Sequence, residues 1–127
     1  MRWISLIVLS LAFAATAADD LAGKYTAFGE DPRTRAYYSY DVEITPQGDV
    51  YKVTWYWEGG ALYDGVGVVL NGLLCVGYAG PVGYGVSVYK IEPDGALKGF
   101  SALPGNPGKG WENLHPKESG AGGAADD

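Results

Sequence analysis

The side chains that most often carry nucleophilic or acid–base chemistry are sparse in this sequence. The single histidine, His115, stands beside Pro116, close to a C-terminal segment rich in Gly, Ala and Asp. A nucleophilic triad needs a base next to its serine or cysteine, and His115 is poorly placed to be one. Because no triad can be assembled, we expect a protein that is not an enzyme. The serines after residue 18 stand in no nucleophile-elbow pattern: Ser39, Ser87, Ser101 and Ser119.

Carboxylates give a weak alternative signal. Asp41 and Glu43 alternate along a predicted strand and so project to one face, while Glu30 and Asp31 lie in a predicted loop. A Ca²⁺ site or a glycosidase-type acid–base pair needs carboxylates that converge, and a solvated strand face explains Asp41 and Glu43 more simply. The chain has no His pair and no Cys pair for a transition metal. We therefore expect no metal and no cofactor.

Cysteine chemistry is equally limited. Cys75 is the single cysteine, so no intramolecular disulfide can form. It lies in the apolar run from Leu73 to Val76, which predicts a buried, inert thiol. An apolar core must then hold the fold together without a covalent link.

Aromatic residues are the strongest signal of a binding site. Ten tyrosines accompany the tryptophans, and Tyr and Trp line ligand mouths as well as cores. If a ligand pocket exists, the inward aromatics of two central strands should form it, and its ligand should be small and apolar or aromatic. Alternatively, Tyr37, Tyr56 and the loop from Gly29 to Arg35 form a patch for an extracellular protein partner. The candidate ligand-binding residues are Tyr38, Tyr40, Tyr51, Trp55 and Trp57.

The segment from Val50 to Glu58 is the clearest of the elements that must position these residues. It alternates between two rows with period two, in residue types that favour strands. We predict that one row faces a core and the other faces solvent. The predicted inward row is Tyr51, Val53, Trp55 and Trp57.

Turn signals divide the rest of the chain into short strands. Asn71-Gly72 is typical of a two-residue hairpin turn, and turns recur every ~8–12 residues. We predict an all-β fold, an antiparallel up-and-down meander of about eight strands that forms a small closed or nearly closed barrel, as in lipocalins and avidins. A β-sandwich is the alternative. Glycines inside strands, Gly65, Gly67, Gly77 and Gly85, favour barrel curvature or aromatic rings lying over the backbone.

Composition predicts three segments. Residues 1–18 read as a secretory signal peptide, with Arg2, an apolar stretch and Ala15-Thr16-Ala17 before the cleavage site. Residues 19–114 form the predicted barrel domain, and residues 115–127 a disordered Gly/Ala/Asp tail. We expect a secreted or periplasmic protein with no membrane span after signal cleavage. Cleavage leaves eight basic and fifteen acidic residues, a formal charge of −7, which argues against nucleic acid as a partner.

Several spaced motifs occur in the predicted strands and turns: Gly23-Lys24-Tyr25, Val42-x-Ile44, Gly48-x-x-Tyr51-x-Val53-x-Trp55, Gly65-x-Gly67, Leu74-x-Val76-Gly77-Tyr78, Val86-x-Val88-Tyr89-x-Ile91 and Gly95-x-Leu97-x-Gly99. This pattern resembles a family of small exported bacterial β proteins of uncharacterised function, some labelled fibronectin-binding. The resemblance covers about residues 21–114 and implies an extracytoplasmic β domain, without catalytic residues. Phe100 and Ser101 stand where that family would have a tryptophan, so no site is carried over there.

Overall fold

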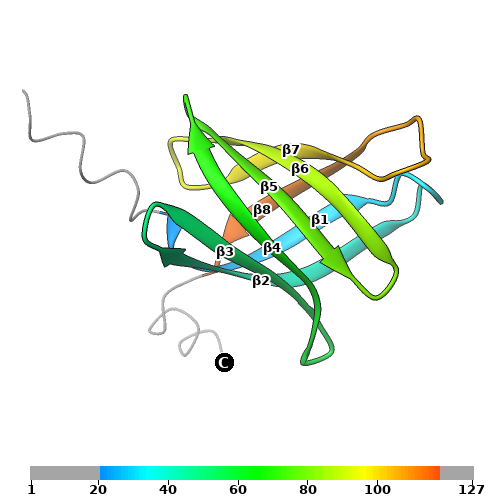
Figure 1. Ribbon diagram of the computed structural model, residues 1–127, viewed down its shortest axis with the longest axis horizontal. Helices are drawn as coiled ribbons and strands as arrows, with labels where there is room; N and C mark the ends of the chain where they lie inside the picture. The colour runs from blue at the N-terminus through cyan, green and yellow to red at the C-terminus, as the bar shows by residue number, and fades with distance from the viewer. Residues whose placement is uncertain (1–20, 118–127) are drawn as a thin grey trace, which may run out of the picture.

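A computed structural model describes residues 21–117 of the chain. Eight strands, connected by turns and loops, make up most of this part (Figure 1). No helix among these residues is long and apolar enough to cross a membrane. The strands are β1 (Gly23–Glu30), β2 (Tyr37–Gln47), β3 (Val50–Trp57), β4 (Gly60–Leu70), β5 (Leu73–Gly80), β6 (Gly83–Ile91), β7 (Leu97–Ala102) and β8 (Gly110–Pro116).

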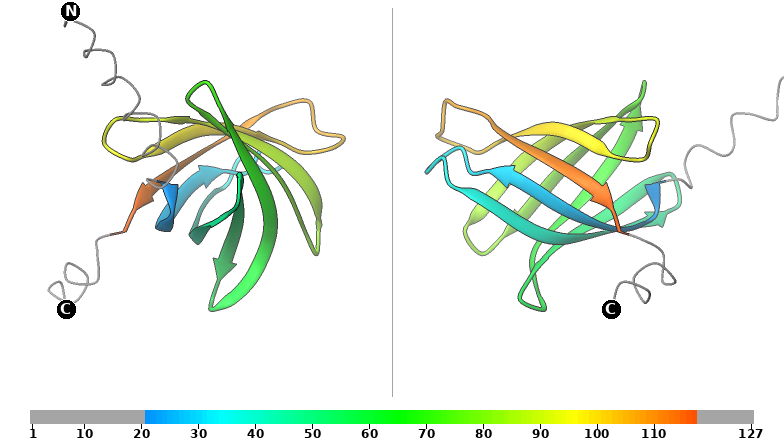
Figure 2. Two further views of the ribbon diagram at one scale, coloured as in Figure 1. Left: turned by 60° about the vertical axis from the view of Figure 1, so that its left-hand side comes forward. Right: turned by 180° about the vertical axis from the view of Figure 1, so that it is seen from behind.

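The sheet is an antiparallel meander that closes on itself. Each strand pairs with its neighbour in sequence, and β1 also pairs with β8, for example Ala27 with Leu114. Figure 2 shows the first and last strands side by side at this seam. Closure leaves no unpaired sheet edge. The predicted barrel is confirmed, and the alternative of a β-sandwich is wrong.

The turns follow from the residues that occupy them. Asn71 and Gly72 have φ values of 52° and 80°, and Glu58 and Gly59 have 51° and 82°. Two consecutive positive φ values are the mark of a type I′ turn, whose twist matches that of the flanking strands. Short turns of this kind keep successive strands adjacent and thereby enforce the meander.

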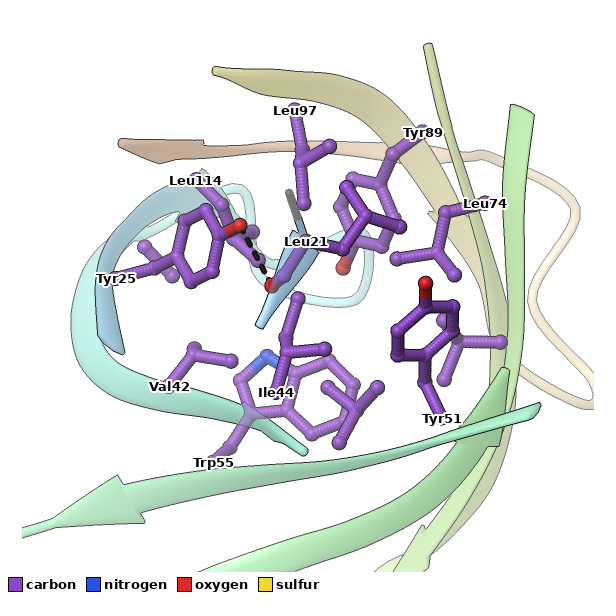
Figure 3. Close-up of a cluster of buried hydrophobic side chains, with 13 residues drawn as sticks. Leu21, Tyr25, Val42, Ile44, Tyr51, Trp55, Leu74, Tyr89, Leu97 and Leu114 are labelled. Carbon is purple, nitrogen blue, oxygen red and sulfur yellow. Dashed lines mark hydrogen bonds between the residues drawn. The ribbon is translucent and has the colours of Figure 1, made fainter. Parts of the chain in front are cut away.

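One end of the barrel interior is packed solid with apolar side chains, and we call it the packed end. Side chains from strands all round the barrel converge there (Figure 3), and Leu21, which precedes β1, lies among them. The hydroxyl of Tyr25 donates a hydrogen bond of 2.8 Å to the carbonyl oxygen of Leu21. This bond holds Leu21 in the packed end of the barrel, and we call Leu21 the plug. The core comprises Leu21, Tyr25, Ala27, Val42, Ile44, Tyr51, Val53, Trp55, Leu74, Val76, Tyr89, Leu97 and Leu114.

The inward row predicted for β3 ends at Trp55 and does not include Trp57. Tyr51, Val53 and Trp55 are buried, but the side chain of Trp57 is 57% exposed. The β3–β4 register shifts between Trp55 and Tyr56, and the pairing of β3 with β2 stops at Tyr56. The extra residue at this shift is Leu62 of β4, because Trp55 pairs with Tyr63 and Tyr56 with Ala61. Trp57 is the last residue of β3 and pairs only with β4, so its side chain lies beyond the part of the wall that both neighbouring strands complete. The expectation that Trp57 belongs to the core is therefore wrong.

Two further expectations differ from the structure. Cys75 is half-buried rather than buried, because it lies in the outward row of β5 between the inward residues Leu74 and Val76. The last strand continues to Pro116, and the amide of Lys117 donates to the carbonyl oxygen of Lys24 at 2.9 Å. The ordered domain thus extends past the predicted boundary at residue 114. The predicted signal peptide, and the predicted tail beyond residue 117, lie outside the described residues.

Candidate functional site

The other end of the barrel interior holds a pocket, and we call it the mouth. The pocket has a volume of about 60 Å³. Five of its lining residues are aromatic, and the rest combine two carboxyl groups, a guanidinium group, two hydroxyls and two apolar residues. The lining residues are Asp31, Pro32, Arg33, Tyr38, Tyr40, Trp55, Tyr63, Tyr78, Ser87, Ser101, Leu103 and Glu112.

Glu112 lies at the inner end of this pocket. Alternation along β8 turns Gly110, Glu112 and Leu114 inward, and the whole Glu112 residue is 4% exposed. Three side chains donate hydrogen bonds to its carboxyl group. The donors to Oε1 are the Trp55 indole, at 3.3 Å, and the Tyr89 hydroxyl, and the donor to Oε2 is the Tyr38 hydroxyl, at 3.0 Å.

Burial and hydrogen bonding act on Glu112 in opposite directions. Loss of solvent raises the pKa of its carboxyl group, and the hydrogen bonds from Tyr89, Tyr38 and Trp55 lower it by a smaller amount, so the pKa is raised. The pKa values of Tyr38 and Tyr89 are also raised, first by burial and then by the nearby carboxylate. Both tyrosines therefore stay protonated at neutral pH and remain hydrogen-bond donors.

The tyrosine rings of the mouth lie against glycines of the barrel wall. A Cβ atom added to Gly85 would stand 2.6 Å from the Tyr78 hydroxyl oxygen. A Cβ on Gly29 would likewise collide with Tyr38, and one on Gly80 with the ring of Tyr63. The glycines thus give the rings room to lie along the wall, which keeps the centre of the mouth open.

The rings also contact one another. Tyr38 and Tyr40 stack with their centroids 4.9 Å apart, and Tyr78 meets Tyr63 edge-on at 5.4 Å and Trp55 at 5.2 Å. Burial and nearby charges raise the pKa of Tyr78 to about 12, so its hydroxyl is also protonated at neutral pH. The wall therefore combines the surface of aromatic rings with several hydroxyl groups.

Hydrogen bonds between two loops brace the rim of the mouth. Arg33 binds the carboxylate of Asp31 through Nε at 3.1 Å and Nη2 at 2.8 Å, and this pairing holds the pKa of Asp31 below its usual range. The amide of Asn106 donates to the Pro32 carbonyl oxygen at 3.4 Å, which ties the β7–β8 loop to the β1–β2 loop. The rim is therefore held in place by both loops.

The structure brings together three of the five residues predicted from sequence. Tyr38, Tyr40 and Trp55 line the pocket. Tyr51 lies in the core of the packed end, and Trp57 is exposed at the end of β3 and is not among the residues that line the pocket. Position along the strand explains the division, because only the half of each inward row nearest the mouth reaches the pocket.

Sequence reasoning overlooked Glu112 at the centre of the site. Trp111, its neighbour in β8, lies half-buried in the outward row, with its ring centroid 6.2 Å from that of Tyr37. A usable signal was present in the alternation of β8, where Glu112 shares a row with Gly110 and Leu114. A carboxyl group in an inward row is uncommon and often functional.

Of the other residues considered for chemistry, Asp31, Ser87 and Ser101 line the pocket, whereas Asp41 and His115 do not. Asp41 is on the outer face, where it forms an ion pair of 2.8 Å with Lys117. His115 is exposed, with its ring tilted against Phe28. Among residues 21–117, no three His, Cys, Asp or Glu side chains gather closely enough to hold a metal ion.

Comparison of the sequence with protein-family models and with curated proteins finds no match. The resemblance to exported β proteins labelled fibronectin-binding therefore stays a prediction.

Proposed function

We propose that this protein is an exported, non-enzymatic module that binds a small ligand in the pocket at the mouth of its barrel. The observation that carries the proposal is a pocket that combines aromatic walls with a few convergent polar groups, Glu112 among them. Ligand sites typically have this composition, in which the apolar wall gives affinity and the polar groups fix orientation.

The polar groups of the pocket are engaged in ways that suit binding better than catalysis. Glu112 accepts three hydrogen bonds, and Asp31 is held by Arg33 in two. Groups held this firmly are preorganised, so little ordering cost is paid when a ligand arrives. The proposal therefore assigns them to recognition.

The pocket volume limits the size of the ligand. The pocket measures about 60 Å³. Pockets for larger organic ligands run to about 300–1,000 Å³. We therefore propose a ligand of few heavy atoms, with apolar surface that can lie against the tyrosine rings.

Two neighbouring tryptophans of β3 allow a direct test of the proposal. A panel of small apolar, aromatic and charged molecules is titrated while tryptophan fluorescence is recorded, in the wild type and in the Trp55→Phe and Trp57→Phe variants. Trp55 lines the pocket and Trp57 does not. We expect the ligand-induced change to survive in Trp57→Phe and to vanish in Trp55→Phe. The reverse pattern, or no response to any member of the panel, would sink the proposal.

A second candidate function, protein interaction, is favoured by the outer face of β4 to β7. Cross-strand pairing places exposed apolar residues side by side on this face, where a hollow of about 450 Å³ lies over Gly77. Exposed apolar patches often mark interaction surfaces. We call this surface the apolar face, and its residues are Val66, Val68, Leu70, Leu73, Val86, Val88 and Phe100.

The shape and charge of the apolar face favour a second copy of the chain as the partner. Val66 and Val86 flank Gly77, and a Cβ added to Gly77 would meet no atom within 4 Å. The valine side chains of one copy could therefore pack into the space above Gly77 of the other. Asp64 lies toward one end of the face and Lys90 toward the other. A twofold axis through the face would bring these opposite charges together.

This interaction surface differs from the patch predicted from sequence. Tyr37 is 79% exposed but tilts against Trp111, and Tyr56 is half-buried. The test is the molar mass in solution measured by light scattering over a range of concentrations. We expect a dimer that Val88→Lys converts to a monomer, whereas the matched exposed change Thr45→Lys leaves it intact. A wild-type protein that stays monomeric at every concentration contradicts self-association.

A further inference from the structure

We infer that the ligand of the mouth pocket is a small organic ammonium ion, bound with its charge toward Glu112 and its methyl or methylene groups against the tyrosine rings. This inference rests on the proposed function and adds the chemical class of the ligand. It follows from the charges, the rings and the size of the pocket.

The first argument is a buried carboxyl group that lacks a basic partner. Three ion pairs occur among residues 21–117, and they engage Asp31, Glu30 and Asp41 but not Glu112. All three hydrogen bonds to Glu112 come from neutral groups. Burial of an ionised carboxylate is costly without an opposite charge. A cationic ligand would supply that charge.

The single guanidinium group that lines the pocket does not fill this role. Arg33 already forms an ion pair with Asp31, with Nη2 2.8 Å from Oδ2, and about half of its side chain is exposed. The charges that line the pocket are therefore Asp31, Arg33 and, when ionised, Glu112, and they sum to −1. An anionic ligand would meet this excess negative charge, whereas a cation would neutralise it.

The second argument is the density of aromatic rings around the carboxyl group. Tyr38, Tyr40, Trp55, Tyr63 and Tyr78 all line the pocket, and their rings stand at interplanar angles from 26° to 75°. Ring faces attract organic cations through their quadrupoles, and cages of such rings recognise methylated ammonium groups. A neutral apolar ligand would also fit these walls but would leave the charge of Glu112 unmatched.

The third argument is size. A pocket of about 60 Å³, well below the roughly 300–1,000 Å³ of sites for larger organic ligands, suits a small cation such as methylammonium, tetramethylammonium or the head group of choline. The inference therefore commits to a monovalent ammonium ion with few heavy atoms.

Proton binding at Glu112 should compete with this ligand. The groups that face its carboxyl are Tyr38 from β2, Trp55 from β3 and Tyr89 from β6, with Tyr78 of β5 and the Asp31–Arg33 pair nearby. Since the tyrosines stay neutral at physiological pH and Asp31 stays ionised, Glu112 is the group that titrates. Affinity for the ammonium ion should rise with pH through the raised pKa of Glu112.

The test uses two ligands of the same shape that differ in charge. Choline and its neutral carbon analogue 3,3-dimethylbutan-1-ol are titrated separately into the wild-type protein by calorimetry at neutral pH. We expect choline to bind about tenfold or more tightly than the alcohol, since cation–π and charge pairing act on choline alone. Glu112→Gln should reduce this preference, because it removes the charge pairing and leaves the aromatic rings, and it should retain weak binding of both.

The outcomes separate this inference from the function on which it rests. Equal affinities for choline and the alcohol in the wild type would overturn the ammonium class and leave the pocket as a binding site for neutral ligands. If neither ligand binds while other small molecules still change the fluorescence of Trp55, the ammonium class is likewise overturned and the pocket remains a binding site. No response of Trp55 to any small molecule would overturn both. The wild-type comparison needs no variant, so misfolding of Glu112→Gln could not obscure it.

Discussion

The two ends of the barrel interior are built from the same alternating strands but serve different purposes. At the packed end the inward residues are mostly aliphatic, with Tyr25 and Tyr51 among them, and they meet around Leu21. At the mouth glycines lie beside tyrosine rings, which gives the rings room to lie along the wall. A closed eight-stranded barrel has an interior just wide enough for side chains to fill or for one small ligand. Glycine placement decides between these outcomes here.

The comparison also shows where polar groups are tolerated. The interior of the packed end is almost wholly apolar, whereas the mouth contains Glu112 with its three donors, and Ser87 faces Ser101 across β6 and β7. A buried polar network costs little only when its members are satisfied, and no buried side-chain polar atom of the described residues lacks a hydrogen-bond partner. Stability should therefore reside mainly at the packed end and recognition at the mouth.

The largest expected effect comes from a truncation at the packed end. Leu114→Ala removes a fully buried side chain of the core, so we expect a loss of about 2–5 kcal/mol in the free energy of unfolding. Leu103→Ala is the matched change at the mouth, where the side chain is only partly buried, and it should cost less than about 1 kcal/mol. Urea denaturation measures both. Equal losses would refute the division between a packed end and an open mouth.

A smaller effect should follow from adding a methyl group to the wall of the mouth. Gly85→Ala places a Cβ atom 2.6 Å from the Tyr78 hydroxyl oxygen and 2.8 Å from the Ala102 carbonyl oxygen. We expect a loss of about 1–3 kcal/mol in stability and weaker ligand binding, because the Tyr78 ring must move into the pocket. The control is Gly77→Ala, on the outer face with open space above it, which should change stability by about 0.5 kcal/mol or less and leave binding unchanged. Identical behaviour of the two variants would argue against a role for glycine in shaping the pocket.

The plug at the packed end should depend on one hydrogen bond. Tyr25→Phe removes the donor to the Leu21 carbonyl oxygen and keeps the ring, so the expected loss is about 1 kcal/mol. Hydrogen exchange should report earlier opening of the start of β1 in this variant. Tyr37→Phe, at an exposed position, serves as the control with no expected loss. If Tyr25→Phe is as stable as the wild type, packing alone retains Leu21.

The subtlest prediction concerns the pH dependence of stability. Because the pKa of Glu112 is raised above its ordinary value of 4.5 in the folded state, its stabilising contribution is fully present below pH 4.5 and declines as pH rises through the raised pKa. Glu112→Gln cannot ionise, so the free energy of unfolding of the variant should fall less than that of the wild type over this range. The amide can accept from Trp55 and Tyr89 and donate to Tyr38, which keeps the packing. If the pH profiles of the wild type and the variant are parallel, Glu112 has the same pKa in the folded and the unfolded protein, and the prediction is contradicted.

The sequence predicted only some of the residues that line the pocket. Alternation placed Tyr38, Tyr40 and Trp55 in inward rows, and all three line the pocket. Alternation has no information about depth along the barrel axis, so Tyr51, in the same row as Trp55, could not be assigned to the packed end. Pairing of β3 with β2 ends at Tyr56, which leaves Trp57 exposed, and alternation does not reveal where the pairing of two strands stops.

The sequence by itself determined the fold class, because period-two alternation and the turn chemistry of Asn71-Gly72 are local properties of the chain. Tertiary structure decided how the barrel closes, through the pairing of β1 with β8, and it decided where the pocket lies. It brings Glu112 to Tyr38, Trp55 and Tyr89, residues 74, 57 and 23 positions away in the chain. These contacts join residues from four strands, so they exist only when the sheet has closed and excluded water from the carboxyl group.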